Sequence, residues 1–284
     1  MTVFNTEPAM RLHRVGFRYG LQTVLDNIDL ALFAGERLAL VGPSGCGKTT
    51  LLHLVAGLLS PWEGQCEHRF QRIRMVFQQP RLLPWQTTLN NLTFGLRALG
   101  IDPRARQAAG RSMAERFGLH ADDLAKYPDQ LSGGMQSRVA LGRALIVEPD
   151  LLLMDEPFSA LDIGHKARLY DDLVRLTETR TSMMMITHDL LEAVRLADRI
   201  LVMAPSPGRI VAEIRLGLAA ALRDDLYVHH NGAALMQNPT VRSAFNLPSS
   251  TAVSVSSHTE TDVLITPVDS MNANPTPNAG VTGC

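Results

Sequence analysis

The chain is poor in the features that mark secreted, membrane-spanning or nucleic-acid-binding proteins. Its three cysteines are scattered among 284 residues, without the spacing of a disulfide framework or a metal site. No apolar run approaches the roughly 18 consecutive residues that a membrane-spanning helix needs. The first residues have neither a basic start nor an apolar core, so we expect no secretory signal. The formal net charge of −1 argues against a protein that binds nucleic acid through a basic face.

What the chain does contain suits a soluble globular protein. Hydrophobic residues make up 45% of it and charged residues 19%, and the length allows one large domain or two small ones. Cys46 lies inside a glycine-rich segment, which suits a reducing compartment. We therefore expect a cytosolic protein that can attach to something in the membrane.

The strongest motif is a glycine-rich loop at residues 42–49. It reads Gly42-Pro43-Ser44-Gly45-Cys46-Gly47-Lys48-Thr49 and stands between a strand-like apolar run and a helix-like run. Glycines let successive N–H groups point at a phosphate, beside a helix N-terminus that favours negative charge. In this pattern the lysine reaches the β- and γ-phosphates and the following hydroxyl binds Mg²⁺. A merely connecting turn is disfavoured because strand and helix supply the context that the motif requires, so we predict a nucleotide site.

A second motif is an apolar run at residues 151–154 that ends in Asp155 and Glu156. A run without alternation is typical of a central parallel strand buried on both faces. Ligands of open α/β sheets gather outside the carboxyl ends of such strands. We therefore expect Asp155 to hold Mg²⁺ through its waters and Glu156 to orient and deprotonate an attacking water. Two solvated acids at a strand end are the alternative, which the phosphate loop disfavours.

Other polar positions are less decisive when taken alone. His188 follows an apolar strand-like run, and a structural and a functional role remain equally open for it. Gln78, at another strand end, is a weak candidate ligand for a metal or a water. Tyr19 fits a core aromatic better than a base-stacking residue. The Ser132-Gly133-Gly134 segment offers exposed N–H groups at a helix start, although an ordinary helix cap explains it better.

In combination, these motifs resemble those of ABC transporter ATPase subunits. The shared elements, in order, are the loop at 42–49, Gln78, the signature Leu131–Gln136, the acidic strand 151–156, the segment Ser159–Asp162 and His188. The resemblance covers roughly residues 10–212, and the Leu-Ser-Gly-Gly signature separates this family from other P-loop NTPases. Segments 79–85 and 207–210 are further similar to the nitrate/sulfonate/taurine-type import ATPases.

The resemblance implies an α/β fold, with a P-loop NTPase (RecA-like) core, an antiparallel β layer and an inserted α-helical subdomain. We expect the ATPase domain at residues 10–214, with the helical subdomain at 81–145, followed by a C-terminal extension at 215–246. Residues 247–284 are rich in Ser, Thr, Asn and Pro and hold no aromatics. Such a segment buries too little apolar surface to offset its ordering entropy, so a disordered tail is predicted.

The resemblance also implies a role for each motif residue. Tyr19 would stack on adenine. The loop from Gly42 to Thr50 would bind the phosphates. Thr49, Gln78 and Asp155 would hold Mg²⁺. Glu156 would be the catalytic base, with Gln78 coupling metal and water to the helical subdomain and His188 positioning the γ-phosphate. Ser132, Gly133, Gly134 and Gln136 would contact the nucleotide bound by a second subunit, and Asp162 would lie in a loop that crosses the dimer interface.

The implied function is that of an ATP- and Mg²⁺-dependent subunit of a transporter. It would hydrolyse ATP to power import of a small anion such as nitrate, sulfonate or taurine. The implied partners are a second copy in a homodimer with composite sites, an integral membrane permease at the cytoplasmic face, and, indirectly, a periplasmic or extracellular substrate-binding protein, with no nucleic acid. The alternative is a non-transport relative acting on DNA or the ribosome. It is disfavoured because residues 81–130 are too short for a coiled-coil arm and each motif occurs once.

Overall fold

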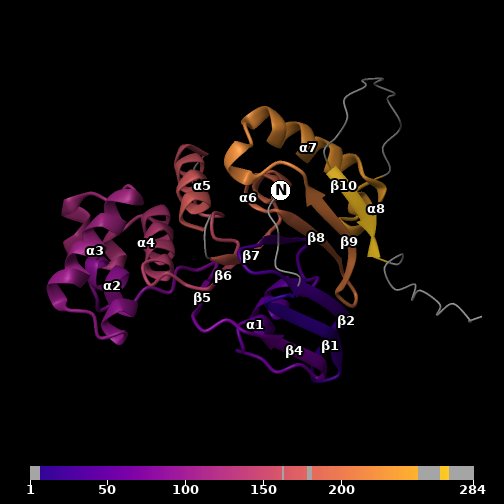
Figure 1. Ribbon diagram of the computed structural model, residues 1–284, viewed down its shortest axis with the longest axis horizontal. Helices are drawn as coiled ribbons and strands as arrows, with labels where there is room; N and C mark the ends of the chain where they lie inside the picture. Colours follow the sequence, from indigo (N-terminus) through magenta and orange to yellow (C-terminus); the bar gives the residue numbers. More distant parts are fainter. Residues whose placement is uncertain (1–6, 162, 178–180, 249–262, 269–284) are drawn as a thin grey trace, which may run out of the picture.

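A mixed, seven-stranded sheet organises the computed structural model, which describes residues 7–161, 163–177, 181–248 and 263–268. The strand order is β10-β9-β8-β3-β7-β6-β5. The parallel strands are β3 (Arg37–Val41), β5 (Ile73–Val76), β6 (Leu151–Asp155), β7 (Ser182–Thr187) and β8 (Arg199–Ala204). β9 (Arg209–Leu216) and β10 (Val263–Pro267) continue the sheet in antiparallel fashion at one edge (Figure 1).

The central strands are buried on both faces, as the unbroken apolar runs predict. In β6, Leu151 and Leu153 belong to one hydrophobic cluster, and Leu152 and Met154 belong to the other. Alternate side chains of a strand point to opposite faces, so each face of the sheet forms a core of its own. The carboxyl ends of β3, β6 and β7 therefore lie at one edge of a sheet covered on both sides.

One of these cores is closed by the antiparallel layer that the alternating pattern of residues 11–32 predicts. It consists of β1 (Met10–Tyr19), β2 (Gln22–Leu32) and β4 (Glu63–His68), in the order β2-β1-β4. Helix α1 (Lys48–Val55) shares the same hydrophobic cluster with this layer. Figure 1 shows the layer and α1 together on one side of the central sheet.

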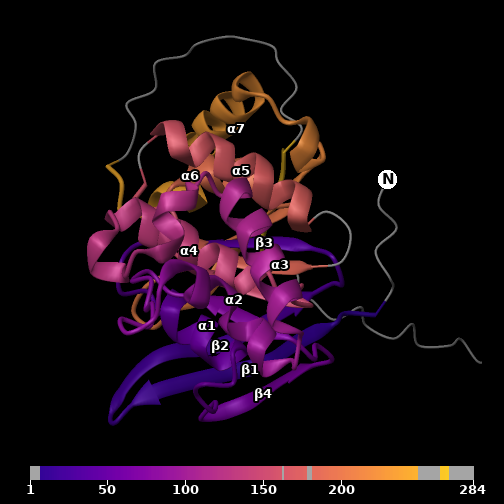
Figure 2. The same cartoon turned by 90° about the vertical axis from the view of Figure 1, so that its left-hand side faces the viewer.

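A helical subdomain projects from one end of the sheet, and the C-terminal segment lies at the other end (Figures 1 and 2). It contains α2 (Thr88–Ala98), α3 (Pro103–Arg116) and α4 (Gly133–Leu145), all within the range 81–145 predicted as helical. Each helix begins where a side chain accepts a hydrogen bond from the first turn, at Thr87, Asp102 and Ser132. No helix in the described part of the chain is both long and apolar enough to cross a membrane.

The other face of the sheet is covered by α5 (Ile163–Thr177), α6 (Leu190–Leu196) and a C-terminal extension that contains α7 (Asp225–Gln237) and α8 (Pro239–Ala244). α7 packs on α6 so closely that a Cβ on Gly232 would collide with Leu191. The buried guanidinium of Arg223 donates hydrogen bonds to the carbonyls of Val194 (2.6 Å) and Ala197 (2.5 Å), at the C-terminal end of α6. The extension is thus part of the folded body.

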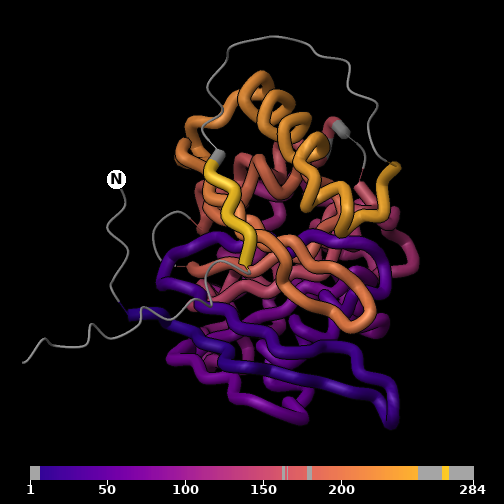
Figure 3. The backbone as a smooth tube through the Cα atoms, turned by 90° about the vertical axis from the view of Figure 1, so that its right-hand side faces the viewer, coloured from indigo at the N-terminus to yellow at the C-terminus, as the bar shows by residue number. Residues whose placement is uncertain are grey.

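The prediction of a disordered tail is wrong for residues 263–267. This segment forms β10, which pairs antiparallel with β9 from Val263 opposite Leu216 to Pro267 opposite Ala212 (Figure 3). Its Val-Leu-Ile-Thr sequence favours a strand, and β9 offers it a sheet edge. Composition averaged over the whole tail hides so short a run. The rest of the predicted tail, 249–262 and 269–284, lies outside the described residues.

A buried ion cluster ties β8 and β9 to the turn before β3. Arg199 Nε lies 2.6 Å from Glu36 Oε1, and its Nη1 lies 3.1 Å from Glu213 Oε2. All three side chains are buried. Removing one partner of such a group leaves an uncompensated charge in a medium that solvates it poorly, so the cluster is sensitive to the loss of the arginine.

Candidate active site

Segments far apart in the sequence converge on one cavity of about 470 Å³. It lies at the carboxyl ends of β3, β6 and β7, where open α/β sheets bind their ligands. Its lining residues are Val24, Ser44, Gly45, Gly47, Lys48, Thr49, Thr50, Gln78, Glu156, Ile186 and His188. The structure therefore brings most of the predicted phosphate and catalytic residues to a single site.

The glycine-rich loop joins β3 to α1 in a conformation that requires glycine. Gly45 and Gly47 have φ angles of 80° and 94°, in the left-handed region that other residues rarely adopt. Gly47 is also the residue that precedes α1, and a Cβ there would lie 2.6 Å from Leu25 Cδ2. Glycine thus opens this helix N-terminus to the cavity, and backbone N–H groups at such a terminus suit phosphate.

Lys48 is held in the wall of the cavity by the loop itself. Its buried ammonium group donates hydrogen bonds of 2.8 Å to the carbonyls of Gly42 and Pro43. Three residues that are predicted to bind nucleotide, Gly42, Pro43 and Cys46, do not line the cavity, although the Gly42 and Pro43 carbonyls hold the lysine. Burial raises the pKa of the Cys46 thiol, which keeps it protonated. The loop thus presents one positive charge to a phosphate.

Thr49 and Asp155 form a preformed pair beside the loop. The Thr49 hydroxyl donates a hydrogen bond of 3.0 Å to Asp155 Oδ2. Asp155 is buried at the end of β6, and this burial raises the pKa of its carboxyl group. A hydroxyl and a carboxylate oxygen at hydrogen-bond distance are the hard donors that Mg²⁺ prefers.

Glu156 projects from a strained turn directly after β6. Its φ angle of 44° is unusual for a residue other than glycine. The turn is fixed by a hydrogen bond of 3.0 Å from the Glu156 N–H to the Ile186 carbonyl, and by one of 3.0 Å from Ser159 Oγ to the Glu156 carbonyl. Strain of this kind persists where surrounding bonds enforce it, and it is common at active sites.

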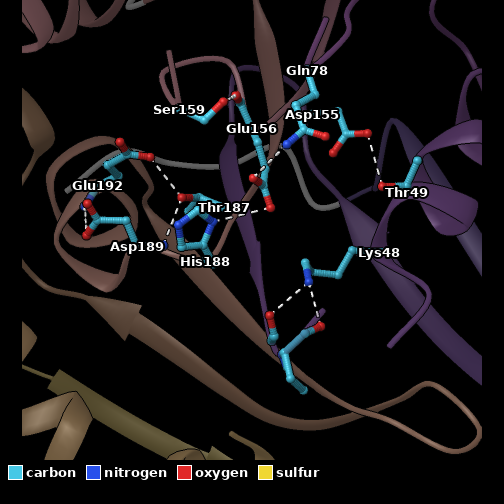
Figure 4. A network of polar contacts seen from close by, with 12 residues as sticks. Lys48, Thr49, Gln78, Asp155, Glu156, Ser159, Thr187, His188, Asp189 and Glu192 are labelled. Atoms are coloured by element: carbon cyan, nitrogen blue, oxygen red, sulfur yellow. Dashed lines mark hydrogen bonds and ion pairs between the residues drawn. The ribbon is translucent and has the colours of Figure 1, made fainter. Parts of the chain in front are cut away.

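The turn brings Glu156 between the other two predicted catalytic residues (Figure 4). Gln78 Nε2 lies 3.3 Å from Glu156 Oε2, and His188 Nδ1 lies 3.3 Å from Glu156 Oε1. The Glu156 side chain is 21% exposed and that of His188 is 64% exposed. The carboxylate is therefore accessible to water while two polar side chains limit its orientation.

Tyr19 lies away from these groups. Its side chain is 53% exposed and packs edge-to-face against Phe17, with ring centroids 4.9 Å apart. It does not line the cavity, so its predicted contact with adenine stays a prediction. Val24 and Ile186 also line the cavity, and neither is predicted from the sequence. Neither belongs to a motif, and only the pairing of their strands places them there.

The signature segment also lies outside the cavity of its own chain. Ser132 accepts a hydrogen bond from the Met135 N–H (3.2 Å), and Ser132 and Gly133 are exposed at the start of α4. Gly134 faces the loop after β6, where a Cβ would lie 3.3 Å from Leu161 Cδ2. Gln136 Nε2 donates hydrogen bonds to carbonyls of the preceding turn, at Pro128 and Leu131. Asp162 lies outside the described residues.

Known proteins share both the sequence and the fold. A family model described as ABC transporter matches residues 25–159. The taurine import ATP-binding protein TauB of Escherichia coli is 40% identical over 209 residues, covering 71% of this chain and 82% of the relative. An aliphatic sulfonates import ATP-binding protein of Pseudomonas savastanoi is 43% identical over 220 residues, covering 76% of this chain and 90% of the relative.

A solved structure is also similar to this chain. It is a dimer of the ATP-binding cassette MJ0796 in a post-hydrolysis state, bound to ADP and Pi. The match has a TM-score of 0.66 and 28% identity, and it covers 72% of this chain and 97% of that chain. The similarity therefore extends over nearly the whole of a cassette. Together with the two import relatives, it shows that the chain belongs to the family of ABC transporter ATP-binding proteins.

Proposed function

We propose that this ABC ATPase powers the import of a small anion, such as a sulfonate, taurine or nitrate, through a membrane permease. The observation that carries the catalytic part is the convergence of the phosphate loop, Glu156, Gln78 and His188 on one cavity. The import direction and the class of cargo are supported by the names of the two curated relatives. Those relatives also favour transport over a role on DNA or the ribosome.

Hydrolysis at this site would depend on positioning and electrostatics more than on covalent chemistry. The loop N–H groups and Lys48 bind the phosphates and offset their charge. Glu156 accepts the proton of the attacking water, a role worth typically ~10²–10⁴ in rate. Gln78 and His188, each 3.3 Å from the carboxylate, hold it in the orientation that this proton transfer needs.

The oxygen donors beside the loop fit Mg²⁺. Thr49 and Gln78 line the cavity, and Asp155, which does not line it, lies behind Thr49 with its Oδ2 3.0 Å from Thr49 Oγ1. These groups would hold the ion. When bound, Mg²⁺ supplies positive charge that stabilises the transferred phosphate. Burial raises the pKa of Asp155 because it disfavours the charged carboxylate, and a bound cation would stabilise that charge.

The exposed signature implies that a second copy of the chain completes each site. Ser132 and Gly133 present the N-terminus of α4 to solvent and do not line the cavity of their own chain. A helix N-terminus favours an anion, so a partner's bound nucleotide would satisfy it. The similar cassette structure is dimeric. We therefore propose a homodimer with two composite ATP sites.

Crosslinking tests this dimer. Cysteines introduced at Ser44 and Ser132, in a background with Cys66 and Cys284 replaced by serine, should crosslink between chains when ATP is present and hydrolysis is blocked. The same pair should fail to crosslink without nucleotide. If no intermolecular crosslink forms with ATP, the composite site is refuted.

The helical subdomain carries the surface that would contact the permease. Trp85, in the segment after Gln78, is 69% exposed, and Phe94 on α2 is 50% exposed. Exposed aromatic side chains are enriched at protein interfaces. Docked there, the protein would lie at the cytoplasmic face of the membrane, and a periplasmic or extracellular binding protein would act on the far side of the permease.

The deciding experiment measures uptake and partners in one strain. A strain that lacks the gene should lose uptake of one anion from a panel of sulfonates, taurine and nitrate, and the wild-type gene should restore it while Lys48→Ala does not. The tagged protein should co-purify with an integral membrane protein. Co-purification with nucleic acid or ribosomes, without a membrane partner, would overturn the transport function.

A further inference from the structure

A buried carboxylate contacts Thr187, the residue before His188, and has no role in the proposed hydrolysis. Glu192, in the first turn of α6, is only 5% exposed. Its Oε1 accepts hydrogen bonds from Lys166 Nζ (2.7 Å) and the Tyr170 hydroxyl (2.9 Å), and its Oε2 accepts one from Thr187 Oγ1 (2.8 Å). A buried carboxylate is costly unless it is paired, and here both oxygens have donors. Figure 4 shows its contact with Thr187.

On one side, this carboxylate fixes the backbone around His188. Thr187 precedes the histidine, and its Oγ1 also accepts a hydrogen bond from the N–H of Asp189, which follows the histidine (3.0 Å). Asp189 in turn caps α6 by accepting from the Leu191 N–H (2.8 Å). The largely exposed His188 side chain has a long 3.3 Å contact with Glu156. Its position therefore depends on the backbone that Thr187 and Asp189 hold.

On the other side, the carboxylate is tied to the loop that carries Glu156. Lys166 and Tyr170 belong to α5, the helix that follows this loop. The Tyr170 ring packs edge-to-face on Phe158, two residues after Glu156, with centroids 5.0 Å apart and planes at 88°. Burial raises the pKa of the Tyr170 hydroxyl well above its ordinary value, so this group remains a hydrogen-bond donor.

We propose that Glu192 is a positioning residue that sets the distance between His188 and Glu156, through Thr187 on one side and Tyr170 on the other. The proposal rests on the role proposed above for His188, which is to orient the Glu156 carboxylate. Misplacement of a reacting group by about 1 Å can cost ~10²-fold in rate. Loosening this network should therefore lower kcat, while the phosphate loop continues to bind ATP.

The test compares Thr187→Val with Thr187→Ser in the full-length protein. Valine has the shape of threonine without the hydroxyl, whereas serine keeps the hydroxyl and loses only a methyl group. Thr187→Val should lower kcat about tenfold and change KM for ATP less than about twofold, as expected for a positioning defect smaller than a full displacement. Thr187→Ser should recover most of the rate. Equal losses in the two variants, or no loss in Thr187→Val, would overturn the proposal.

A double-mutant cycle with His188→Ala separates positioning from general destabilisation. Radiolabelled ATP keeps slow variants measurable. If Thr187 acts through the histidine, Thr187→Val should cause no further loss in the His188→Ala background. Losses that multiply would overturn the proposal. A wild-type kcat in His188→Ala alone would instead refute the role of His188, together with any positioning of it. Tyr170→Phe, which removes one hydroxyl, gives the same cycle if Thr187→Val does not fold.

Discussion

Replacement of Glu156 by glutamine separates catalysis from every other property of the site. The two side chains have the same shape, so the change removes the charge and the ability to accept a proton. A general base contributes typically ~10²–10⁴ in rate, which corresponds to about 3–5 kcal/mol at 1.36 kcal/mol for each factor of ten. We expect kcat for ATP hydrolysis to fall by at least about 100-fold.

The structure predicts little effect of this replacement on folding. The contacts of Glu156 with Gln78 and His188 are long, at 3.3 Å each, and the histidine partner is 64% exposed. Ion pairs with such exposure contribute about 0–1 kcal/mol. For a domain of this size, the expected change in Tm is at most about 4 °C. ATP binding should persist, because the phosphate loop and Lys48 are untouched.

The assay measures phosphate release at saturating ATP and Mg²⁺, with Tm and nucleotide binding measured on the same samples. Glu115→Gln is the matched control, since it removes the same charge from an exposed side chain on α3 that does not line the cavity. Size-exclusion chromatography with ATP should show a dimer of Glu156→Gln. A Glu156→Gln protein that hydrolyses ATP within about threefold of the wild-type rate would remove Glu156 from its proposed role.

Further variants test the buried charges and the C-terminal segment. Arg199→Met should lower the free energy of unfolding by about 3–5 kcal/mol, because the buried Glu36 carboxylate loses its ion-pair partner and Glu213 keeps only its pair with Arg215. An unchanged denaturation midpoint would contradict this. Because burial raises the pKa of Asp155, Asp155→Asn should raise Tm of the nucleotide-free protein at pH 8, and the gain should shrink as the wild-type carboxyl protonates on acidification. Asp150→Asn should instead lower Tm at pH 8, since hydrogen bonds from backbone N–H groups hold the pKa of Asp150 low. If both variants shifted Tm in the same direction, the opposite pKa shifts of the two carboxyl groups would be refuted. Truncation after Leu247 should leave ATPase activity unchanged. Truncation after Leu216 should abolish it, because it removes the Arg223 hydrogen bonds to the C-terminal end of α6. Equal activity in the two truncated proteins would show that ATP hydrolysis does not need those hydrogen bonds.

The parts of the site that the sequence predicts are those that depend on local pattern. The glycine loop, the acidic strand end and His188 each follow an apolar strand, and the carboxyl ends of parallel strands share one edge of a sheet. This rule is enough to bring Lys48, Glu156 and His188 together before the fold is known. It succeeds because each of these strands is an unbroken apolar run and every motif is contiguous in the sequence.

The parts that the sequence does not predict depend on contacts between distant elements. Val24 lines the cavity only because β2 passes beside the phosphate loop. Glu192 carries no motif, and its partners come from α5 and β7, which no periodicity relates. The signature shows a different limit, since Ser132 does not line the cavity of its own chain and, in the proposed homodimer, its ligand would be bound by the second chain.

The strand formed by residues 263–267 changes what the margin of the central sheet presents to other molecules. Without it, β9 would end the sheet as an open row of N–H and C=O groups along eight residues, from Arg209 to Leu216. Unpaired rows of this kind recruit extended segments of neighbouring chains. Residues 263–267 cover that row from Ala212 to Leu216, and the edge of the sheet there becomes the five-residue strand β10. A protein shortened before Val263 would thus keep its ATPase activity and become prone to self-association, so the benefit of β10 would appear during storage and at high protein concentration.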